Sequence, residues 1–211
     1  DAVRIVDCRI ESNVAQYDGG GVACYGGAPV FTNSLICLNF AGGSGGGMIF
    51  RKCEPEMVQC TVTANTAPEA GGIICEDNGD ATLRNSIVYG NTPDGIRAGE
   101  SSVTVAFSNV AGGWPGDGNL DMDPRFISGP NGDYYLDQYG AGAAVQSPCV
   151  DAGSSPAVEQ TFRMFGTPCS MAGFTTRIDS IPDAGVVDMG YHYSASDFGL
   201  TPAVVLDMTT H

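Results

Sequence analysis

The sequence predicts an all-β solenoid of stacked coils, on the strength of three observations. First, an asparagine recurs with a fixed 26-residue period, at Asn13, Asn39, Asn65 and Asn91. Second, glycine triplets at residues 19–21 and 45–47 follow the first two asparagines at a fixed distance. Third, the apolar stretches are short and rich in β-branched residues, without a sustained helical period. A fixed period in this range is typical of stacked repeats.

Each 26-residue copy fits one coil of a right-handed parallel β-helix. It is too short for a strand–helix–strand unit, which needs about 30 residues. Coils that rise by about 4.8 Å place equivalent residues directly above each other. The expected columns are Ile5, Phe31, Met57 and Leu83; Ile10, Ile36, Val62 and Val88; and the small residues Cys8, Ser34, Cys60 and Ser86. The four asparagines should form a hydrogen-bonded ladder at one bend, and glycines should form the other bend.

Three regions follow from these patterns. Residues 1–110 carry the coils, the last of which, from Glu100 to Val110, is degenerate. Residues 111–193 are rich in Gly, Pro and Asp and lack the 26-residue register. We expect them to form an irregular cap packed on the last coil, because a solenoid must close its end. Residues 194–211 are interpreted as a tail or a linker to a missing domain.

Composition restricts the classes of function. The chain has 211 residues and a net charge of −15, from nine Lys and Arg against 24 Asp and Glu. Such a surface disfavours nucleic acid and anionic lipid. No apolar run approaches the length of a membrane span, so no membrane insertion is expected. Eight cysteines favour an oxidising compartment. We therefore expect an extracellular or cell-surface location.

The strand edge of the first coil is expected to need a cover. Residues 3–10 already form its strand region, so an open end would present unpaired backbone groups. We expect the rest of a longer polypeptide, or another chain, to cover this N-terminal coil.

The cysteines suggest one disulfide. Cys149 and Cys169 each follow a proline and bracket a polar loop, so they form the best candidate pair. Cys8 and Cys60 share a column two coils apart, at about 9.6 Å, which is too far for a bond. We interpret these two as free thiols. Cys24 and Cys75 raise the same problem of distance, and the pairing of Cys37, Cys53, Cys60 and Cys75 stays open.

One acidic loop is a candidate calcium site. It carries Asp117, Asn119, Asp121 and Asp123 between glycines. Alternating carboxylate and amide oxygens suit Ca²⁺. The loop lacks the glycine and the bidentate glutamate of an EF-hand, and the same side chains also form turns. Both interpretations stay open, and no other cofactor is expected.

Two further groups suggest catalysis. Asp151 and Asp188 each lie beside a glycine and could act together in sugar hydrolysis; carboxylates that accept backbone N–H bonds within the cap are the alternative. Arg51, Lys52 and Arg84 are the basic residues within the coils that could serve a lyase as a base. A solvated ion pair with Glu54 and Glu56 is the simpler account of the first two.

The remaining candidates are aromatic or imidazole side chains. Trp114, Tyr134 and Tyr135 are candidates for stacking on sugar rings, although aromatic side chains in a glycine-rich cap also supply core. His192 stands between Tyr191 and Tyr193 in an alternating run. It is interpreted as a packed strand residue rather than a catalyst.

The motifs resemble two known groups. The repeats, with Phe31-Thr32-Asn33-Ser34 and the glycine runs, resemble right-handed parallel β-helix proteins of the polymorphic outer-membrane-protein type. The later motifs resemble the C-terminal end of secreted bacterial proteins called choice-of-anchor Q: residues 108–110, 118–126, 132–136, 147–153 and 188–190. This resemblance covers nearly the whole chain and implies a secreted or surface-attached bacterial protein. It implies no reaction.

The sequence favours a non-catalytic extracellular β-helix module for adhesion, surface structure or glycan binding. Its expected partner is a polysaccharide or another cell-surface component. The alternative is a β-helix polysaccharide lyase or glycoside hydrolase that acts on an acidic polysaccharide.

Overall fold

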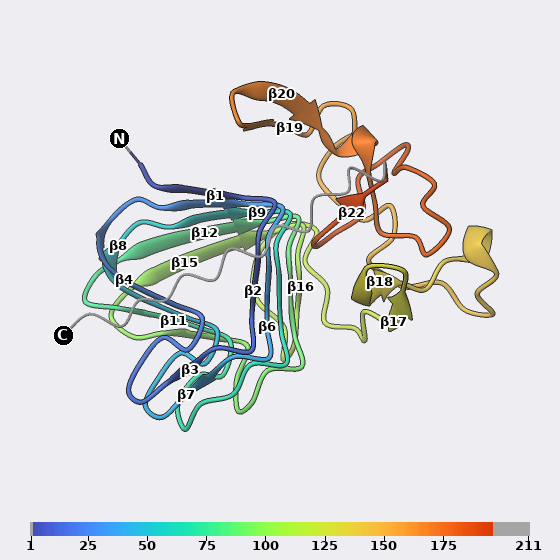
Figure 1. The fold of residues 1–211 in the computed structure, drawn as a ribbon. Helices are drawn as coiled ribbons and strands as arrows, with labels where there is room; N and C mark the ends of the chain where they lie inside the picture. The colour runs from blue at the N-terminus through green and yellow to red at the C-terminus, as the bar shows by residue number, and fades with distance from the viewer. Residues whose placement is uncertain (1, 196–211) are drawn as a thin grey trace.

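The computed structural model describes residues 2–195. These residues form a parallel β-solenoid of about four turns with roughly 26 residues per turn, followed by an irregular segment that lies beside it (Figure 1). No helix among the described residues is long and apolar enough to cross a membrane.

Three parallel sheets form the walls of the solenoid. Sheet 1 contains, in spatial order, β1 (Arg4–Val6), β5 (Val30–Thr32), β9 (Glu56–Val58), β12 (Asp80–Arg84) and β15 (Ser102–Ala106). Sheet 2 contains β2 (Arg9–Glu11), β6 (Leu35–Cys37), β10 (Thr61–Thr63), β13 (Ile87–Tyr89) and β16 (Asn109–Val110). Sheet 3 contains β4 (Val22–Gly27), β8 (Met48–Cys53), β11 (Ile73–Glu76) and β14 (Ile96–Ala98). A short pair, β3 (Val14–Ala15) and β7 (Phe40–Ala41), lies between sheets 2 and 3 in the chain.

The predicted apolar columns are confirmed. Phe31 lies opposite Ile5 on one side and Met57 on the other, and Met57 lies opposite Leu83. The corresponding residues of sheet 2 are equally in register. These columns point inward and form the main core. The last coil is shortened, since Leu83 pairs with Val105 after a shorter interval than the one between Met57 and Leu83, as expected of a degenerate coil.

The asparagine ladder is also confirmed. Each side-chain amide donates to the Oδ1 of the next asparagine, over 3.0 Å from Asn13 to Asn39 and 2.9 Å from Asn39 to Asn65 and from Asn65 to Asn91. Each Oδ1 also accepts the backbone N–H of the preceding ladder residue. A polar column inside the bend is therefore satisfied along its length.

The glycines do not form a separate bend, as the sequence predicted, but lie beside the asparagine ladder between sheets 2 and 3, where a Cβ on Gly47 would be 3.1 Å from Asn65 Nδ2. Close backbone approach requires glycine at these positions. A Cβ on Gly46 would lie 2.5 Å from the carbonyl oxygen of Thr66 and 2.6 Å from that of Gly71. Glycine thus lets neighbouring coils approach at this bend.

The irregular segment differs from the prediction in its position. Only its beginning lies on the last coil, where Leu120 bridges to Asn109. The rest runs along the side of the solenoid, beside sheet 2 (Figure 1). Its elements are β17 (Phe126–Gly129), β18 (Gly132–Leu136), η1 (Tyr139–Ala141), β19 (Thr161–Met164), β20 (Thr167–Ser170), η2 (Met171–Gly173), β21 (Phe174–Thr175) and β22 (Tyr193–Ser194). We call residues 111–194 the side cap; residues 196–211, and with them most of the predicted tail, lie outside the described residues.

The physical reason for this position is the outer face of sheet 2. Leu35 and Cys37 are fully buried there against Tyr135, Tyr191 and Tyr193 of the side cap. Further along, the buried Ile87 packs in one cluster with Leu136, Cys149 and Met189 of the side cap. The outer face of sheet 2 thus has apolar residues at Leu35 and Ile87, with Thr61 in register between them. Burial of these apolar side chains draws the cap along the side of the coils.

Candidate functional site

A second polar column, absent from the sequence predictions, connects the solenoid to the side cap. It consists of Asp7, Asn33, Gln59 and Asn85, again with the 26-residue period. All four have left-handed backbone conformations, with φ values of 52°, 45°, 56° and 52°. They form the corner between sheets 1 and 2, and Asp and Asn tolerate this conformation better than most residues. The regular spacing was available in the sequence and could have revealed the column.

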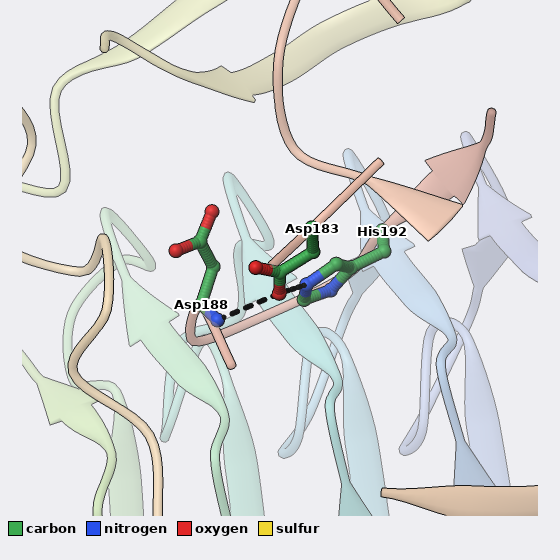
Figure 2. Close-up of side chains that lie close together, drawn as sticks. All are labelled: Asp183, Asp188 and His192. Carbon is green, nitrogen blue, oxygen red and sulfur yellow. Dashed lines mark hydrogen bonds and ion pairs between the residues drawn. The ribbon is translucent and has the colours of Figure 1, made fainter. Parts of the chain in front are cut away.

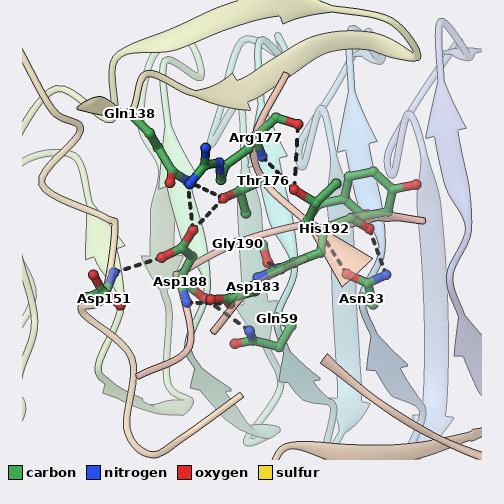
Figure 3. Close-up of polar contacts among 12 residues, drawn as sticks. Asn33, Gln59, Gln138, Asp151, Thr176, Arg177, Asp183, Asp188, Gly190 and His192 are labelled. Carbon is green, nitrogen blue, oxygen red and sulfur yellow. Dashed lines mark hydrogen bonds and ion pairs between the residues drawn. The ribbon is translucent and has the colours of Figure 1, made fainter. Parts of the chain in front are cut away.

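Three side chains of this corner column bind the side cap coil by coil, and Figure 3 shows two of them, Asn33 and Gln59. Asn33 accepts the backbone N–H of His192 over 2.8 Å and donates to its carbonyl over 2.9 Å. One coil along, the Gln59 amide donates to the carbonyl of Asp188 over 3.0 Å. In the next coil, the Asn85 Oδ1 accepts the backbone N–H of Ser154 over 2.9 Å. The corner column thus serves as the docking ridge for the side cap.

Behind this ridge lies a buried ion pair. His192 Nε2 is 2.9 Å from Asp183 Oδ2, and the side chains are 0% and 3% exposed. His192 Nδ1 is 2.9 Å from the carbonyl oxygen of Gly190. Both ring nitrogens therefore face oxygen atoms, and the ring is held from two sides. The sequence interpretation of His192 as a packed strand residue is confirmed, since it is fully buried next to β22.

Asp188 completes the cluster. Its Oδ1 accepts the backbone N–H of Asp151 over 2.7 Å, and its Oδ2 accepts hydrogen bonds from the side chains of Gln138 and Thr176. Burial, reinforced by the charge of Asp183, raises the pKa of Asp188 to about 6. The structure thus confirms that Asp188 accepts a backbone N–H within the cap. Asp151 and Asp188 are therefore joined by the backbone N–H of Asp151 and not by their two carboxylates.

Among residues 2–195, Asp183, Asp188 and His192 are the one group of three or more acidic, histidine or cysteine side chains whose ligand atoms all lie within 4.8 Å of one another (Figure 2). Each of these side chains is already hydrogen-bonded within the cap. A hollow of about 160 Å³ lies beside Asp188, with Arg177 among its lining residues, and Arg177 is paired with Asp179. The cluster has the character of a structural clamp, because its polar atoms are committed to holding chain segments together.

The acidic loop at residues 117–123 makes turn and coil-end contacts in this structure, and calcium binding by it stays a prediction. Asp117, Asp121 and Asp123 do not gather around one point in the described structure. Asn119 instead accepts the backbone N–H of Ser108 and donates to the carbonyl of Val105, and Asp121 accepts the N–H of Gly112. These are turn and coil-end contacts, as the alternative interpretation predicted.

The predicted Cys149–Cys169 disulfide is wrong for this structure, in which all eight cysteines are free. Cys149 is buried against sheet 2 with Ile87, whereas Cys169 belongs to a separate cluster around Phe174. The two therefore lie in different hydrophobic cores of the cap. The interpretation of Cys8 and Cys60 as free thiols is confirmed.

The three aromatic candidates mainly supply core. Tyr135 is 1% exposed and stacks on Tyr193 with ring centroids 3.8 Å apart, so it has no face free for a sugar. Trp114 packs on the coil core and donates its indole N–H to the carbonyl of Val103. Tyr134 is half-buried and packs edge-on against Phe126. The prediction of a glycan contact is therefore wrong for Tyr135. Its ring is buried between the outer face of sheet 2 and the ring of Tyr193, which is the core role that the alternative interpretation gave it.

Two basic residues of the coils differ in their surroundings. Arg51 is bound to Glu76 over 2.8 Å and to Asp18 over 3.0 Å. These hydrogen bonds raise its pKa further. It is an ion-paired arginine, although its partners differ from the predicted Glu54 and Glu56. Arg84, in contrast, is exposed on the outer face of sheet 1.

Arg84 lines a shallow hollow of about 320 Å³ on β9, β12 and β15. Exposed Glu56, Thr82 and Thr104 surround it, and half-buried Val58 and Ala106 also contribute to its lining. The hollow thus combines hydrogen-bonding groups with a small apolar surface. It lies on a wall of the solenoid that the side cap does not cover.

Comparisons with known proteins agree with the fold. A family model described as a right handed beta helix region matches residues 1–113, more than half of the chain. The matched range covers the strands of all three sheets. No curated protein and no solved structure gives a significant match.

Proposed function

Because this chain belongs to the right-handed β-helix family, we propose that it is a non-catalytic extracellular module that binds an extended glycan on the outer face of sheet 1. One observation carries this proposal. The side cap and its clamp occupy sheet 2, which leaves the hollow around Arg84 as the polar recess on an open wall.

The chemistry of the hollow suits a sugar chain. The aliphatic surface of Val58 and Ala106 can pack against the C–H face of a pyranose ring. Glu56, Thr82, Thr104 and Arg84 offer both acceptors and donors to the ring hydroxyls. Strands spaced by about 4.8 Å repeat these groups along the solenoid axis, which favours an extended polymer over a compact ligand.

Charge argues for a neutral glycan. The net charge of −15 repels a polyanion. Arg84 is the single basic residue that lines the hollow. An acidic polysaccharide is therefore the weaker candidate.

The alternative is a polysaccharide lyase or glycoside hydrolase. A hydrolase of the usual kind needs two carboxyl groups about 5–9.5 Å apart across the scissile bond. The hollow offers Glu56 as its one carboxylate among the lining residues, and the acidic groups of the clamp are buried. This favours binding over turnover.

The proposed location rests on the motifs of the side cap. Their resemblance to choice-of-anchor Q proteins supports secretion by a bacterium and display at its surface, where adhesion or surface structure would use the exposed wall. Calcium has no part in this proposal, because the loop at 117–123 is committed to turns.

Affinity electrophoresis against neutral and acidic polysaccharides tests the proposal. We expect retardation by a neutral polymer, without release of reducing or unsaturated ends. The variant Arg84→Ala should weaken binding by at least about tenfold, since loss of a hydrogen bond to a charged group costs about 1.5–3 kcal/mol. Lys52→Ala, an exposed basic residue of β8 outside the hollow, is the matched control. Equal loss in both variants, or any turnover that Arg84→Ala abolishes, would overturn the proposal.

A further inference from the structure

Two cysteines from neighbouring coils meet at the corner between sheets 3 and 1. Cys24 lies in β4 of the first coil and Cys53 ends β8 of the second. Their sulfur atoms are 3.2 Å apart. Their separation along the chain is three positions longer than the repeat period, so a search for residues in one column does not pair them.

The backbone at this corner explains the contact. In the parallel register, Cys24 lies opposite Phe50, and Cys53 lies opposite Gly27. Lys52 has a φ of 54°, and Gly26 and Gly27 have φ values of 84° and 86°. The chain therefore bends sharply in both coils, which brings side chains three positions out of register together.

We propose that Cys24 and Cys53 form a dithiol site that a disulfide oxidant converts into an intramolecular bond between the first and second coils. A disulfide sulfur pair is about 2.05 Å apart. The two thiols must therefore approach by about 1.2 Å, a movement within reach of side-chain rotation next to two flexible glycines.

The surroundings of the two thiols support this reaction. Cys53 is fully buried in the main core, whereas Cys24 is partly exposed at the first coil. Cys75 belongs to the same core cluster as Cys53. However, it lies two coils from Cys24 in the register, because Phe50 stands between them. Cys24 is thus the thiol that an oxidant from solvent reaches first.

The reaction balances with a small disulfide such as oxidised glutathione as the oxidant. The Cys24 thiolate attacks one sulfur and releases a first molecule of reduced thiol. The Cys53 thiolate then attacks the mixed disulfide at Cys24 and releases a second. Overall, the two S–H bonds of the protein and the S–S bond of the oxidant break, while one S–S bond in the protein and two S–H bonds in the released thiols form. Both protons and both electrons thus leave with the reduced thiols.

The bond would secure the most exposed part of the solenoid. In the first coil Val3, Val14, Tyr17 and Tyr25 are 66–77% exposed. A cross-link to the buried second coil would limit local opening of this coil.

Thiol mapping of the full chain tests the proposal. The protein is treated with oxidised glutathione at pH 8.5, alkylated under denaturing conditions, digested and analysed by mass spectrometry. This pH is chosen because burial raises the pKa of Cys24 to about 11, and thiolate formation sets the rate. We expect the number of alkylated cysteines to fall from eight by two, and the linked peptides to contain Cys24 and Cys53.

Three variants sharpen the test. Cys24→Ser and Cys53→Ser should each abolish the cross-link, whereas Cys169→Ser, on the distant β19–β20 hairpin, should still form it. Oxidation should also slow amide hydrogen exchange in residues 4–27 of the wild-type protein by at least about tenfold. Retention of all eight thiols, a Cys53–Cys75 link or a link between two molecules would each overturn the proposal.

Discussion

Replacement of Asn65 by alanine is the strongest perturbation of the asparagine ladder. The Asn65 side chain is fully buried. Its Nδ2 donates to Asn91 Oδ1 and to the carbonyl of Ile36, and its Oδ1 accepts the backbone N–H and the side-chain amide of Asn39. Truncation removes a hydrogen bond from each of these four groups. The Asn39 side-chain amide still donates to the carbonyl of Ile10, and Asn91 Oδ1 still accepts the Asn65 N–H. The cost therefore comes from two groups, the Asn39 N–H and the Ile36 carbonyl. At about 1–3 kcal/mol for each buried group, the free energy of unfolding should fall by roughly 2–6 kcal/mol.

The column provides its own control. Asn13 has the same role in the first coil but is exposed, and its side chain donates only to Asn39. Asn13→Ala should therefore cost no more than about 1 kcal/mol. Asn65→Asp separates hydrogen bonding from cavity formation, because it preserves the shape but turns the donor toward Asn91 into an acceptor. We expect this variant to be at least as destabilised as Asn65→Ala.

Equilibrium denaturation in urea, followed by circular dichroism at a strand-sensitive wavelength, gives these free energies. A loss in Asn65→Ala within about 1 kcal/mol of that in Asn13→Ala would refute the reasoning. The loss expected for Asn65→Ala is a large part of the free energy of unfolding of a typical domain, which is about 5–15 kcal/mol.

Three further predictions concern the clamp, the corner column and the glycine bend. His192→Ala leaves the buried Asp183 unpaired and should cost about 3–5 kcal/mol, with faster proteolysis of residues 126–193 than in the surface control Arg163→Ala. Burial raises the pKa of Asp7 from 3.8 to about 6, against a weaker opposing effect of its hydrogen bond from Asn33. The stability from Asp7 is therefore fully present below about pH 3.8 and lost as pH rises through about 6. Asp7→Asn should accordingly be more stable than wild type by about 1–2 kcal/mol at pH 7.5 but equal to it at pH 3.5 in denaturant titrations; the same difference at both pH values would contradict this. Gly46→Ala places a Cβ against two carbonyl oxygens and should lower the free energy of unfolding by about 2–3 kcal/mol, measured by thermal unfolding. Gly173→Ala, with open space around the added Cβ, should leave it unchanged in that assay.

The sequence was sufficient for the coils because their period is visible in single columns. The asparagines at positions 13, 39, 65 and 91 and the apolar residues of sheets 1 and 2 share one 26-residue period. Stacking in register then follows from the geometry of parallel strands. The corner column of Asp7, Asn33, Gln59 and Asn85 has the same period, but it mixes three residue types and was not recognised.

The position of the side cap was not predictable in the same way. It depends on Leu35 and Ile87 pointing outward, and a strand buried on both faces reads as a continuous apolar run without indicating what covers it. For the same reason the sequence left Tyr135 open between sugar stacking and core packing, and only its burial in the structure decides for core. The Cys24–Cys53 contact escaped prediction because it depends on backbone bends at Gly26, Gly27 and Lys52 rather than on sequence spacing.

The account depends on two polar columns, one that joins the coils and one that fixes the side cap to them. Hydrogen exchange measured residue by residue by NMR tests both directly. We predict that the backbone amides of Asn39, Asn65 and His192 are among the slowest to exchange. In the double variant Asn33→Ala, Gln59→Ala, only the His192 amide should become fast while the coil amides stay protected. Rapid exchange of all three amides in the wild-type protein would contradict the stacked coils and the docked cap together.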